Sequence, residues 1–277
     1  ETQKVFDHVS IDGTWIVPSI STEMFCGLDE INVLKNVLAL SNPQVQDTVF
    51  IQGGIYIVRA LNNDDKCLKV SDNTFLVING EIRLEANDYE RYALLYIEGD
   101  NIQIEGDGMI VCDRNTHTGT TGEWGMGVII SNGRNVTISG LNISDCWGDC
   151  IYINNNSKNI IINNCKLNSG RRQGISIIDV NDLVIRNSTI KNIGGTNPQY
   201  AINLEPNRED YVDNVLIQDV VIEDCVGGIS TYGKKKGRPD TQIGRVEITN
   251  CFIRTLEKIP LRLRTCKEIV VINNRIH

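Results

Sequence analysis

Several features are missing from this sequence, and each absence narrows what the protein can be. No stretch of about 18 apolar residues occurs, so no transmembrane helix is expected. Basic residues are not in excess either, since the formal net charge is −8. Nucleic acid is therefore not expected as a partner, because binding to phosphates needs a basic surface.

Paired cysteines are also absent. The sequence has nine cysteines, and none of them belongs to a C-x-x-C pair. This spacing does not fit a zinc site, and a disulfide scaffold is not expected in a chain of this length. We therefore expect the cysteines to be small buried side chains, and we predict no metal site and no cofactor.

What the sequence does contain is a repeat. From about Val70 onward a short alternating apolar segment recurs, with inward positions at Ile130, Ile153, Ile177, Leu204, Thr231 and Leu263. The spacing varies from 23 to 32 residues, unlike the longer periods of helix-pair repeats. Alternation broken by Gly and Asn is typical of short strands.

A second set of segments recurs in step with the first. Asn135-Val-Thr-Ile138 and Asn159-Ile-Ile-Ile162 are two examples. A turn residue follows each segment, and these residues are Gly140, Asn164, Asn187, Asp219, Asn250 and Asn273. Gly and Asn tolerate the left-handed conformation of a tight turn, and stacked Asn side chains can hydrogen-bond along an axis. The two columns predict an all-β fold, a single-stranded parallel β-helix.

The N-terminal end of such a helix needs a cap, because it exposes strand edges and apolar core. Ile31, Leu34, Val37 and Leu38 share one face of an amphipathic helix, which predicts an α-helical cap over about 28–40. We expect one structural domain: residues 1–60 contain the cap and the first coil, and residues 61–277 form the β-helix.

The cap, the Gly53-Gly-Ile-Tyr-Ile57 segment and the Asn-rich coils resemble the pectate-lyase-like superfamily. The nearest pattern is the polygalacturonase family of glycoside hydrolases, with D-D-C-x-x-I and, one coil later, G-H-G-I-S-I. The counterparts here are Trp147-Gly-Asp-Cys-Ile-Tyr-Ile153 and Arg171-Arg-Gln-Gly-Ile-Ser-Ile177. The resemblance implies a right-handed β-helix and places Asp149 at a catalytic carboxylate. Gly148 and Gln173 depart from the Asp and His of the family, so the motif is incomplete.

Outward side chains on one sheet, together with the loops beside it, are expected to form a groove for a polysaccharide. The long loop at 111–125 adds several functional side chains next to this groove, and loops on a rigid scaffold are where sites concentrate. The predicted substrate-binding residues are Asp113, His117, Glu123, Trp124, Tyr152, Gln173, Tyr200, Asn203, Tyr232, Arg262 and Arg264.

The favoured function is hydrolysis of a glycosidic bond by two carboxyl groups. Asp149 and Glu205 are the predicted acid and base, at about 10 Å along the axis if their strands are two coils apart. Asp145 is the alternative partner. Arg171 or Arg172 would hold a carboxylate of the substrate, and Arg262 and Arg264 would favour an anionic sugar, so an acidic polysaccharide is expected.

Two other functions stay open at this point. The first is a polysaccharide lyase, for which the resemblance implies Ca²⁺ and an arginine base, a role that Arg171 and Arg172 suit. The second is a non-catalytic glycan-binding β-helix such as a phage tailspike or adhesin module, for which a homotrimer is a possible assembly. All three place the protein outside the cell, on the cell surface or in the periplasm.

Overall fold

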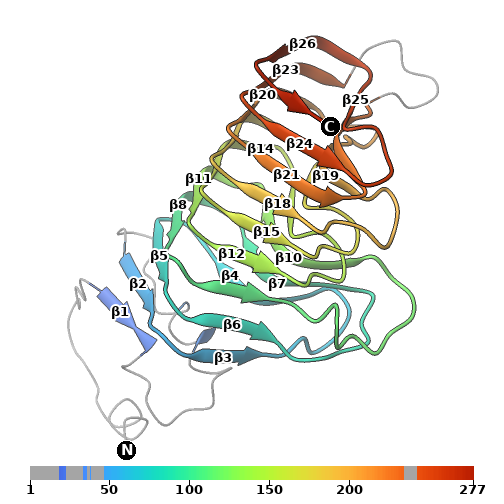
Figure 1. Ribbon diagram of the computed structural model, residues 1–277. Helices are drawn as coiled ribbons and strands as arrows, with labels where there is room; N and C mark the ends of the chain where they lie inside the picture. Colours follow the sequence, from blue (N-terminus) through green and yellow to red (C-terminus); the bar gives the residue numbers. More distant parts are fainter. Residues whose placement is uncertain (1–18, 23–33, 36–37, 39–46, 234–241) are drawn as a thin grey trace, which may run out of the picture.

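The computed structural model describes residues 19–22, 34–35, 38, 47–233 and 242–277, and in them the chain forms a parallel β-helix (Figure 1). Successive coils stack along one axis, and a full coil contributes one strand to each of three sheets. Neighbouring strands pair in parallel. The predicted all-β fold is confirmed.

The three sheets are called sheet 1, sheet 2 and sheet 3, and their strands are given below. Sheet 2 is entered first, sheet 1 second and sheet 3 third, as in the succession β10, β11, β12.

Sheet 1 has ten strands, in the order β1 (Ser19–Ser21), β2 (Asp47–Ile51), β5 (Thr74–Ile78), β8 (Asp100–Glu105), β11 (Arg134–Ser139), β14 (Ser157–Asn163), β17 (Val180–Arg186), β20 (Val212–Gln218), β23 (Ile243–Thr249) and β26 (Cys266–Ile272). Sheet 2 has eight strands, in the order β25 (Leu261–Leu263), β22 (Gly227–Thr231), β19 (Tyr200–Leu204), β16 (Ile175–Ile177), β13 (Ile151–Asn154), β10 (Trp124–Ser131), β7 (Arg91–Ile97) and β4 (Asp65–Val70). Sheet 3 has nine strands, in the order β27 (Arg275–Ile276), β24 (Phe252–Thr255), β21 (Val221–Cys225), β18 (Thr189–Lys191), β15 (Lys166–Asn168), β12 (Asn142–Ser144), β9 (Met109–Val111), β6 (Glu81–Leu84) and β3 (Ile55–Val58).

Inward side chains of one coil stack directly on those of the next and form the core. Ile130, Ile153 and Ile177 are in register on sheet 2, followed by Leu204, and all four are fully buried. Each such aliphatic side chain stabilises the fold by about 1.5–3 kcal/mol relative to an exposed one. The alternation seen in the sequence therefore corresponds to the observed register.

The turns between sheets 1 and 3 contain the expected left-handed residues. The backbone φ is 52° at both Asn164 and Asn187. It is also positive at Gly140, Asp219, Asn250 and Asn273. The side-chain ladder, however, runs one column earlier than predicted. It joins Asn73 to Asn101 (3.0 Å), then reaches Asn135 (3.1 Å) and Asn159 (2.7 Å), all near the start of sheet 1 strands. These residues also have positive φ, so the strand itself bends there.

The cysteines are buried as expected. The eight in the described part of the chain are free, and seven of them are buried. The predicted cap over about 28–40 falls mainly on residues outside the described ones. Leu34 and Leu38 are described, and both are buried in the core.

The last coil leaves part of the core open. Ile269, Val271 and Ile276 continue buried files in register but are themselves 36%, 42% and 44% exposed. This coil therefore receives less stabilisation from burial than the coils before it.

Candidate functional site

A groove of about 380 Å³ lies on the outer face of sheet 2. Its lining combines aromatic, charged and apolar side chains: Trp124, Tyr152, Arg172, Ile178, Glu205, Pro206, Asn207 and Tyr232. Trp124 and Tyr232 are among the exposed large hydrophobic residues, at 39% and 52%. The groove thus has the mixed apolar and polar lining of a ligand site.

The outward file of sheet 2 has the predicted register. Tyr152 aligns with Ser176, then with Asn203, Ser230 and Arg262. Ser176, Asn203 and Ser230 are nevertheless buried. The accessible surface of the groove is therefore made by its loops and strand ends more than by this file.

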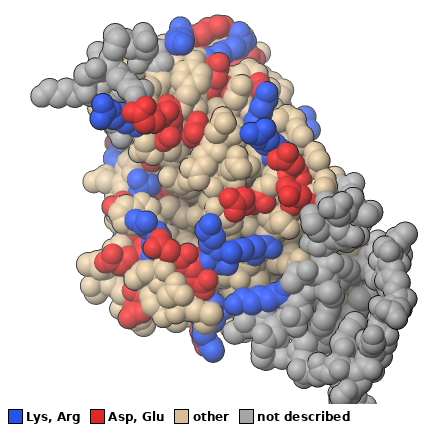
Figure 2. Space-filling model, turned by 180° about the vertical axis from the view of Figure 1, so that it is seen from behind, with Lys and Arg blue, Asp and Glu red and all other residues tan. Residues whose placement is uncertain are grey.

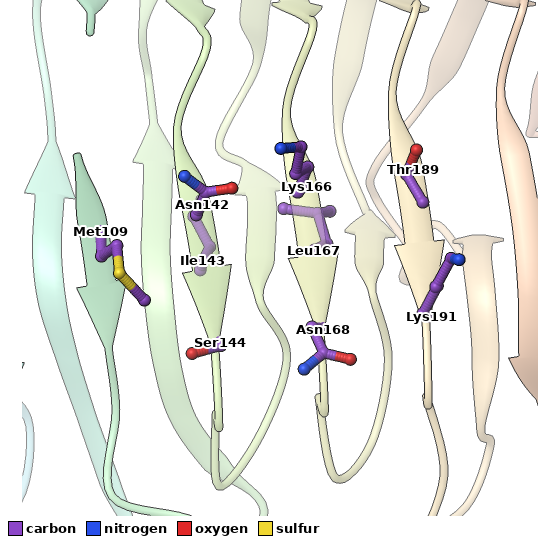
Figure 3. Close-up of a pocket in the computed structure, with 9 residues that line it drawn as sticks. All are labelled: Met109, Asn142, Ile143, Ser144, Lys166, Leu167, Asn168, Thr189 and Lys191. Carbon is purple, nitrogen blue, oxygen red and sulfur yellow. The ribbon is translucent and has the colours of Figure 1, made fainter. Parts of the chain in front are cut away.

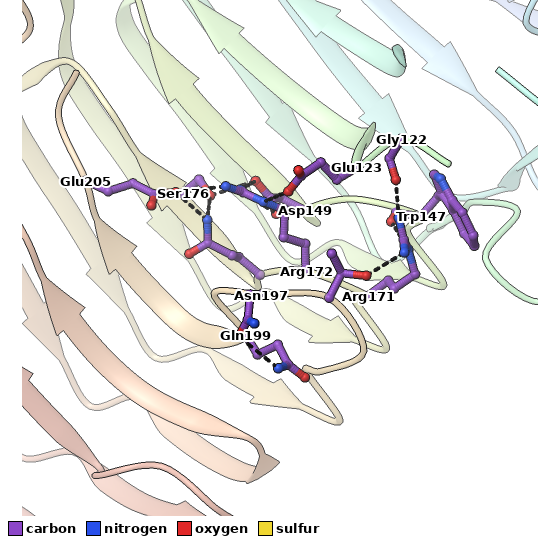
Figure 4. Close-up of polar contacts among 12 residues, drawn as sticks. Gly122, Glu123, Trp147, Asp149, Arg171, Arg172, Ser176, Asn197, Gln199 and Glu205 are labelled. Carbon is purple, nitrogen blue, oxygen red and sulfur yellow. Dashed lines mark hydrogen bonds and ion pairs between the residues drawn. The ribbon is translucent and has the colours of Figure 1, made fainter. Parts of the chain in front are cut away.

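Arg172 is the centre of the site (Figure 4). Its Nε lies 2.9 Å from Glu123, its Nη1 lies 3.1 Å from Asp149, and its Nη2 lies 3.5 Å from Glu205. Burial lowers the pKa of Arg172, but the three carboxylates raise it by more. The pKa of Arg172 therefore lies above its ordinary value. One guanidinium group therefore draws together carboxylates from three separate segments of the chain.

Asp149 is fully buried beneath this guanidinium. Its Oδ2 accepts a hydrogen bond of 2.6 Å from the Ser176 hydroxyl, and both of its oxygens face Arg172. Burial raises the pKa of Asp149 to about 7, against the opposing effect of Arg172 and Ser176. Burial, with Asp149 and Glu205 adding to it, also raises the pKa of Tyr152 to about 12.

A chain of hydrogen bonds joins Asp149 to Glu205. The amide nitrogen of Gln173 donates to Ser176 at 2.5 Å and to Glu205 at 2.6 Å, and Ser176 donates to Asp149 at 2.6 Å. The bonded oxygens of the two carboxyl groups are therefore at most about 8 Å apart. Both share Arg172 and Gln173 as partners.

The loop that precedes β10 explains the departure at Gly148. A Cβ atom at this position would lie 2.7 Å from the backbone oxygen of Glu123, so a larger residue does not fit. Glu123 brings its own carboxylate to Arg172. No carboxylate stands directly before Asp149 in the chain, and Glu123 contributes one from the loop.

Asp113 and His117 anchor this loop. Asp113 is buried and accepts hydrogen bonds from the Tyr92 hydroxyl (2.5 Å) and from Asn87 (2.9 Å), and it pairs with His117 Nδ1 at 2.8 Å. The His117 ring stacks on Trp147 with centroids 3.9 Å apart. Burial and Asp113 together raise the pKa of Tyr92. These side chains contact the protein and not the groove.

Arg171 differs from its neighbour. Its guanidinium lies over the Trp147 ring at 3.6 Å and donates to the backbone oxygens of Trp147 and Gly122 and to the Thr196 hydroxyl. Burial lowers its pKa. Arg171 thus joins three loops, while Arg172 reaches the groove.

The remaining predicted residues lie apart from this centre. Asp145 sits in a turn with positive φ and accepts hydrogen bonds from Asn115 and Ser144. Tyr200 is buried and accepts a hydrogen bond from Arg262 at 3.1 Å. Arg264 is exposed at the end of the last sheet 2 strand.

Several residues of the site were not among the predicted site residues: Ile178, Pro206 and Asn207 in the groove, and Ser176 and Trp147 beside it. Ser176 was assigned to the outward file, but its contact with Asp149 depends on the loop that carries Gln173. Trp147 lies two residues before Asp149, and this spacing is the only signal that the sequence offered for it.

A second hollow, of about 650 Å³, lies on the outer face of sheet 3 (Figure 3). Met109, Lys166 and Lys191 line it together with several short polar side chains. Lys191 pairs with Glu223 at 2.7 Å. This hollow contains none of the predicted site residues.

The charged side chains on the surface are of both signs (Figure 2). On the face shown in Figure 2, acidic and basic side chains are interspersed. In the described part of the chain, no three His, Cys, Asp or Glu side chains are arranged to hold a metal ion. The described residues also contain no helix that is long and apolar enough to span a membrane.

Two curated relatives from Bacillus subtilis (strain 168) are similar in sequence. The SPbeta prophage-derived uncharacterized protein YorA is 29% identical over 182 residues, covering 57% of this chain and 31% of the relative. The uncharacterized protein YclG is 28% identical over 215 residues, covering 67% and 36%. The chain thus spans about a third of the length of these relatives.

Solved structures share the architecture at low identity. The mannuronan C-5 epimerase AlgE6 A-module of Azotobacter vinelandii superposes with a TM-score of 0.66 at 12% identity, covering 92% of this chain and 75% of the other. An alginate lyase from Paenibacillus sp. gives 0.60 at 12%, covering 94% and 95%. A tailspike mutant of E. coli bacteriophage HK620, solved with a pentasaccharide, gives 0.60 at 11%, covering 99% and 58%.

At such identities these structures show the fold alone. The model of the right-handed β-helix region matches residues 61–237, which is more than half of the chain. The chain belongs to this right-handed β-helix family.

Proposed function

We propose that the groove on sheet 2 binds a polysaccharide and that Asp149 and Glu205 hydrolyse one of its glycosidic bonds. The observation that carries the proposal is the pairing of two unlike carboxyl groups. Asp149 is buried and has its pKa raised to about 7, whereas Glu205 lines the groove. Glycoside hydrolysis needs such a pair, one group donating a proton and the other acting on water or on the sugar.

The walls of the groove support a sugar as ligand. Trp124, Tyr152 and Tyr232 offer ring faces or edges around the charged centre. Aromatic rings pack against the apolar face of a sugar, and nearby polar groups bind its hydroxyls. Proteins of the same fold include polysaccharide-acting enzymes and an oligosaccharide-bound tailspike.

The step that this proposal requires is a movement of Arg172. The guanidinium covers Asp149, so the proton of Asp149 reaches a glycosidic oxygen only after Arg172 has shifted. Hydroxyl groups of an entering sugar can accept hydrogen bonds from Arg172 in place of Asp149, while Glu123 and Glu205 keep their contacts with the guanidinium. Glu205 then remains as the carboxylate beside the anomeric carbon.

The test is a panel of polysaccharides assayed for new reducing ends with the wild type, Asp149→Asn and Glu205→Gln. Each substitution is expected to lower kcat by about 100-fold or more. Glu268→Gln is the matched control, because Glu268 lies on sheet 1, where it pairs with Arg245. Activity of both site variants within a few-fold of the wild type would contradict the assignment. A product that absorbs in the ultraviolet, formed only with Ca²⁺, would indicate a lyase.

A second candidate is a glycan-binding module without catalysis. The observation that favours it is the complete burial of Asp149 under Arg172. In this case oligosaccharides bind, no product forms with any of them, and Asp149→Asn changes affinity only through the position of Arg172.

A further inference from the structure

The charges at the centre of the groove are unbalanced. Each of the three nitrogens of the Arg172 guanidinium already contacts a carboxylate. Glu123 and Glu205 are both partly exposed, so even a protonated Asp149 leaves two carboxylates against one guanidinium. An incoming carboxylate would have to displace one of these acids from Arg172.

Arg171 and Arg91 are held by other contacts, so neither presents its guanidinium to a carboxylate bound beside Arg172. Arg171 bonds to Trp147, Gly122 and Thr196. Arg91 lies 4.8 Å from the Trp124 ring but pairs with Asp64 at 3.3 Å.

The surroundings of the centre favour an uncharged ring. Tyr232 and Trp124 are exposed in the lining of the groove that contains Glu205, and Ile178 and Pro206 add apolar surface. A sugar with only hydroxyl groups can donate to Glu205 and Glu123, whereas a uronate cannot do so with its carboxylate. One uncompensated like charge at close range weakens binding by about tenfold.

We propose that the centre of the groove, between Trp124 and Tyr232, takes an uncharged sugar ring and discriminates against a uronate. This inference rests on the proposed function for the location of the site. At this central position it replaces the acidic substrate expected from the sequence, because Arg172 binds Glu123, Asp149 and Glu205 and Arg171 lies on Trp147.

Arg262 and Arg264 lie at the β25 end of sheet 2, where the register places Arg264 one strand from Tyr232, at the edge of the groove farthest from Glu123. Arg262 lies on β25, two strands beyond β19, and thus roughly 10 Å from the strand that precedes Glu205. The inference concerns the central position alone and leaves that end of the sheet aside.

Matched oligosaccharides that differ only at C6 provide the test. Hexamers of β-1,4-mannose and β-1,4-mannuronate form one pair, and the corresponding glucose and galactose pairs with their uronates extend it. Calorimetric titration at pH 7 and low salt is expected to give at least tenfold tighter binding of the neutral member. The difference shrinks at high salt, since screening weakens the repulsion.

Glu123→Gln supplies the decisive comparison. It removes one carboxylate and leaves Arg172 Nε without its acidic partner, so the ratio of uronate to neutral affinity is expected to rise about tenfold. Glu268→Gln, with the same chemical change on sheet 1, leaves the ratio unchanged.

The outcomes separate this inference from the proposed function. Equal or tighter binding of the uronate by the wild type overturns the inference, as does an unchanged ratio in Glu123→Gln. If only uronates are hydrolysed, the preference for an uncharged ring is overturned, while the proposed hydrolysis stands. Neutral preference without any product supports it together with the non-catalytic candidate. Tightest binding of a glucosamine hexamer overturns the choice of an uncharged ring, and no binding in any pair rejects both proposals.

Discussion

Asp149 connects stability to pH through a single buried carboxyl group. Its pKa rises from 3.8 to about 7 because burial penalises the charged form. The folded protein therefore holds this proton more tightly than the unfolded chain. The resulting stabilisation is fully present below pH 3.8 and is lost as the pH rises through about 7.

Asp149→Asn removes this titration, which gives the first prediction. The free energy of unfolding of the variant, relative to wild type, is expected to increase between pH 4 and 8 by on the order of 4 kcal/mol. Urea unfolding at pH 4, 6 and 8 measures it. Glu98→Gln, at an exposed position, is the control and is expected to stay within about 0.5 kcal/mol. A constant difference between Asp149→Asn and wild type would show that Asp149 titrates in its ordinary range.

The raised pKa of Asp149 also predicts how kcat/KM changes at alkaline pH. If Asp149 donates the proton, kcat/KM falls about tenfold per pH unit above a pKa near 7. A pH–rate profile on any hydrolysed substrate measures this. A rate that is level from pH 6 to 9 would assign the acid to another residue.

At the scale of elements, the Asn ladder holds sheet 1 in register. Asn135 donates to Asn101, accepts from Asn159, and has a φ of 55°. Only Gly and, to a lesser degree, Asn and Asp adopt this conformation without strain. Asn135 therefore contributes to stability in two ways, through its backbone conformation and through its side-chain hydrogen bonds.

Two substitutions separate these parts. Asn135→Gly loses the ladder bonds but keeps the conformation, whereas Asn135→Ala loses both. We expect a loss of about 1 kcal/mol for Gly and about 2–3 kcal/mol for Ala, measured by urea unfolding. Equal losses would indicate that the positive φ adds no strain at this position.

The loop at 112–123 is the element that brings Glu123 and Trp124 to the groove. Its anchor is Asp113, which has three buried or partly buried donors around it. Asp113→Ala is expected to cost about 3 kcal/mol, because these donors lose their acceptor. Hydrogen exchange in the loop should accelerate and glycan affinity should fall.

Trp124→Ala is the matched control for the loop. It removes a half-exposed ring from the groove, so affinity is expected to fall while stability and hydrogen exchange at 112–118 change little. If Asp113→Ala leaves exchange unchanged, the loop is held by other contacts.

At the scale of the whole molecule, stability depends on contacts between neighbouring coils. Ile253 and Ile276 are in register on β24 and β27, yet Ile253 is fully buried and Ile276 is 44% exposed. We expect Ile253→Ala to cost about 3 kcal/mol and Ile276→Ala less than about 1 kcal/mol, as measured by urea unfolding. Similar losses would mean that the last coil is covered in solution.

The repeat and its register could be predicted from the sequence, because alternation and left-handed turn residues are local properties. Ile153 and Ile177 needed no tertiary information to be placed in the core. The ladder was predicted one column too late, since several columns contain Asn and only the geometry of the coil decides which side chains meet. The order of outward and inward residues on sheet 2 followed from the same alternation.

The chemistry of the groove depended on the tertiary structure. Arg171 and Arg172 are adjacent in sequence and equivalent in type, yet one lies on Trp147 and the other binds Asp149, Glu123 and Glu205. Those partners come from different coils, and burial of Asp149 depends on how the loops fold over the sheet. The sequence by itself determined the coil and its register, whereas only the tertiary structure decided which charges meet, because burial and ion pairing arise between segments far apart in the chain.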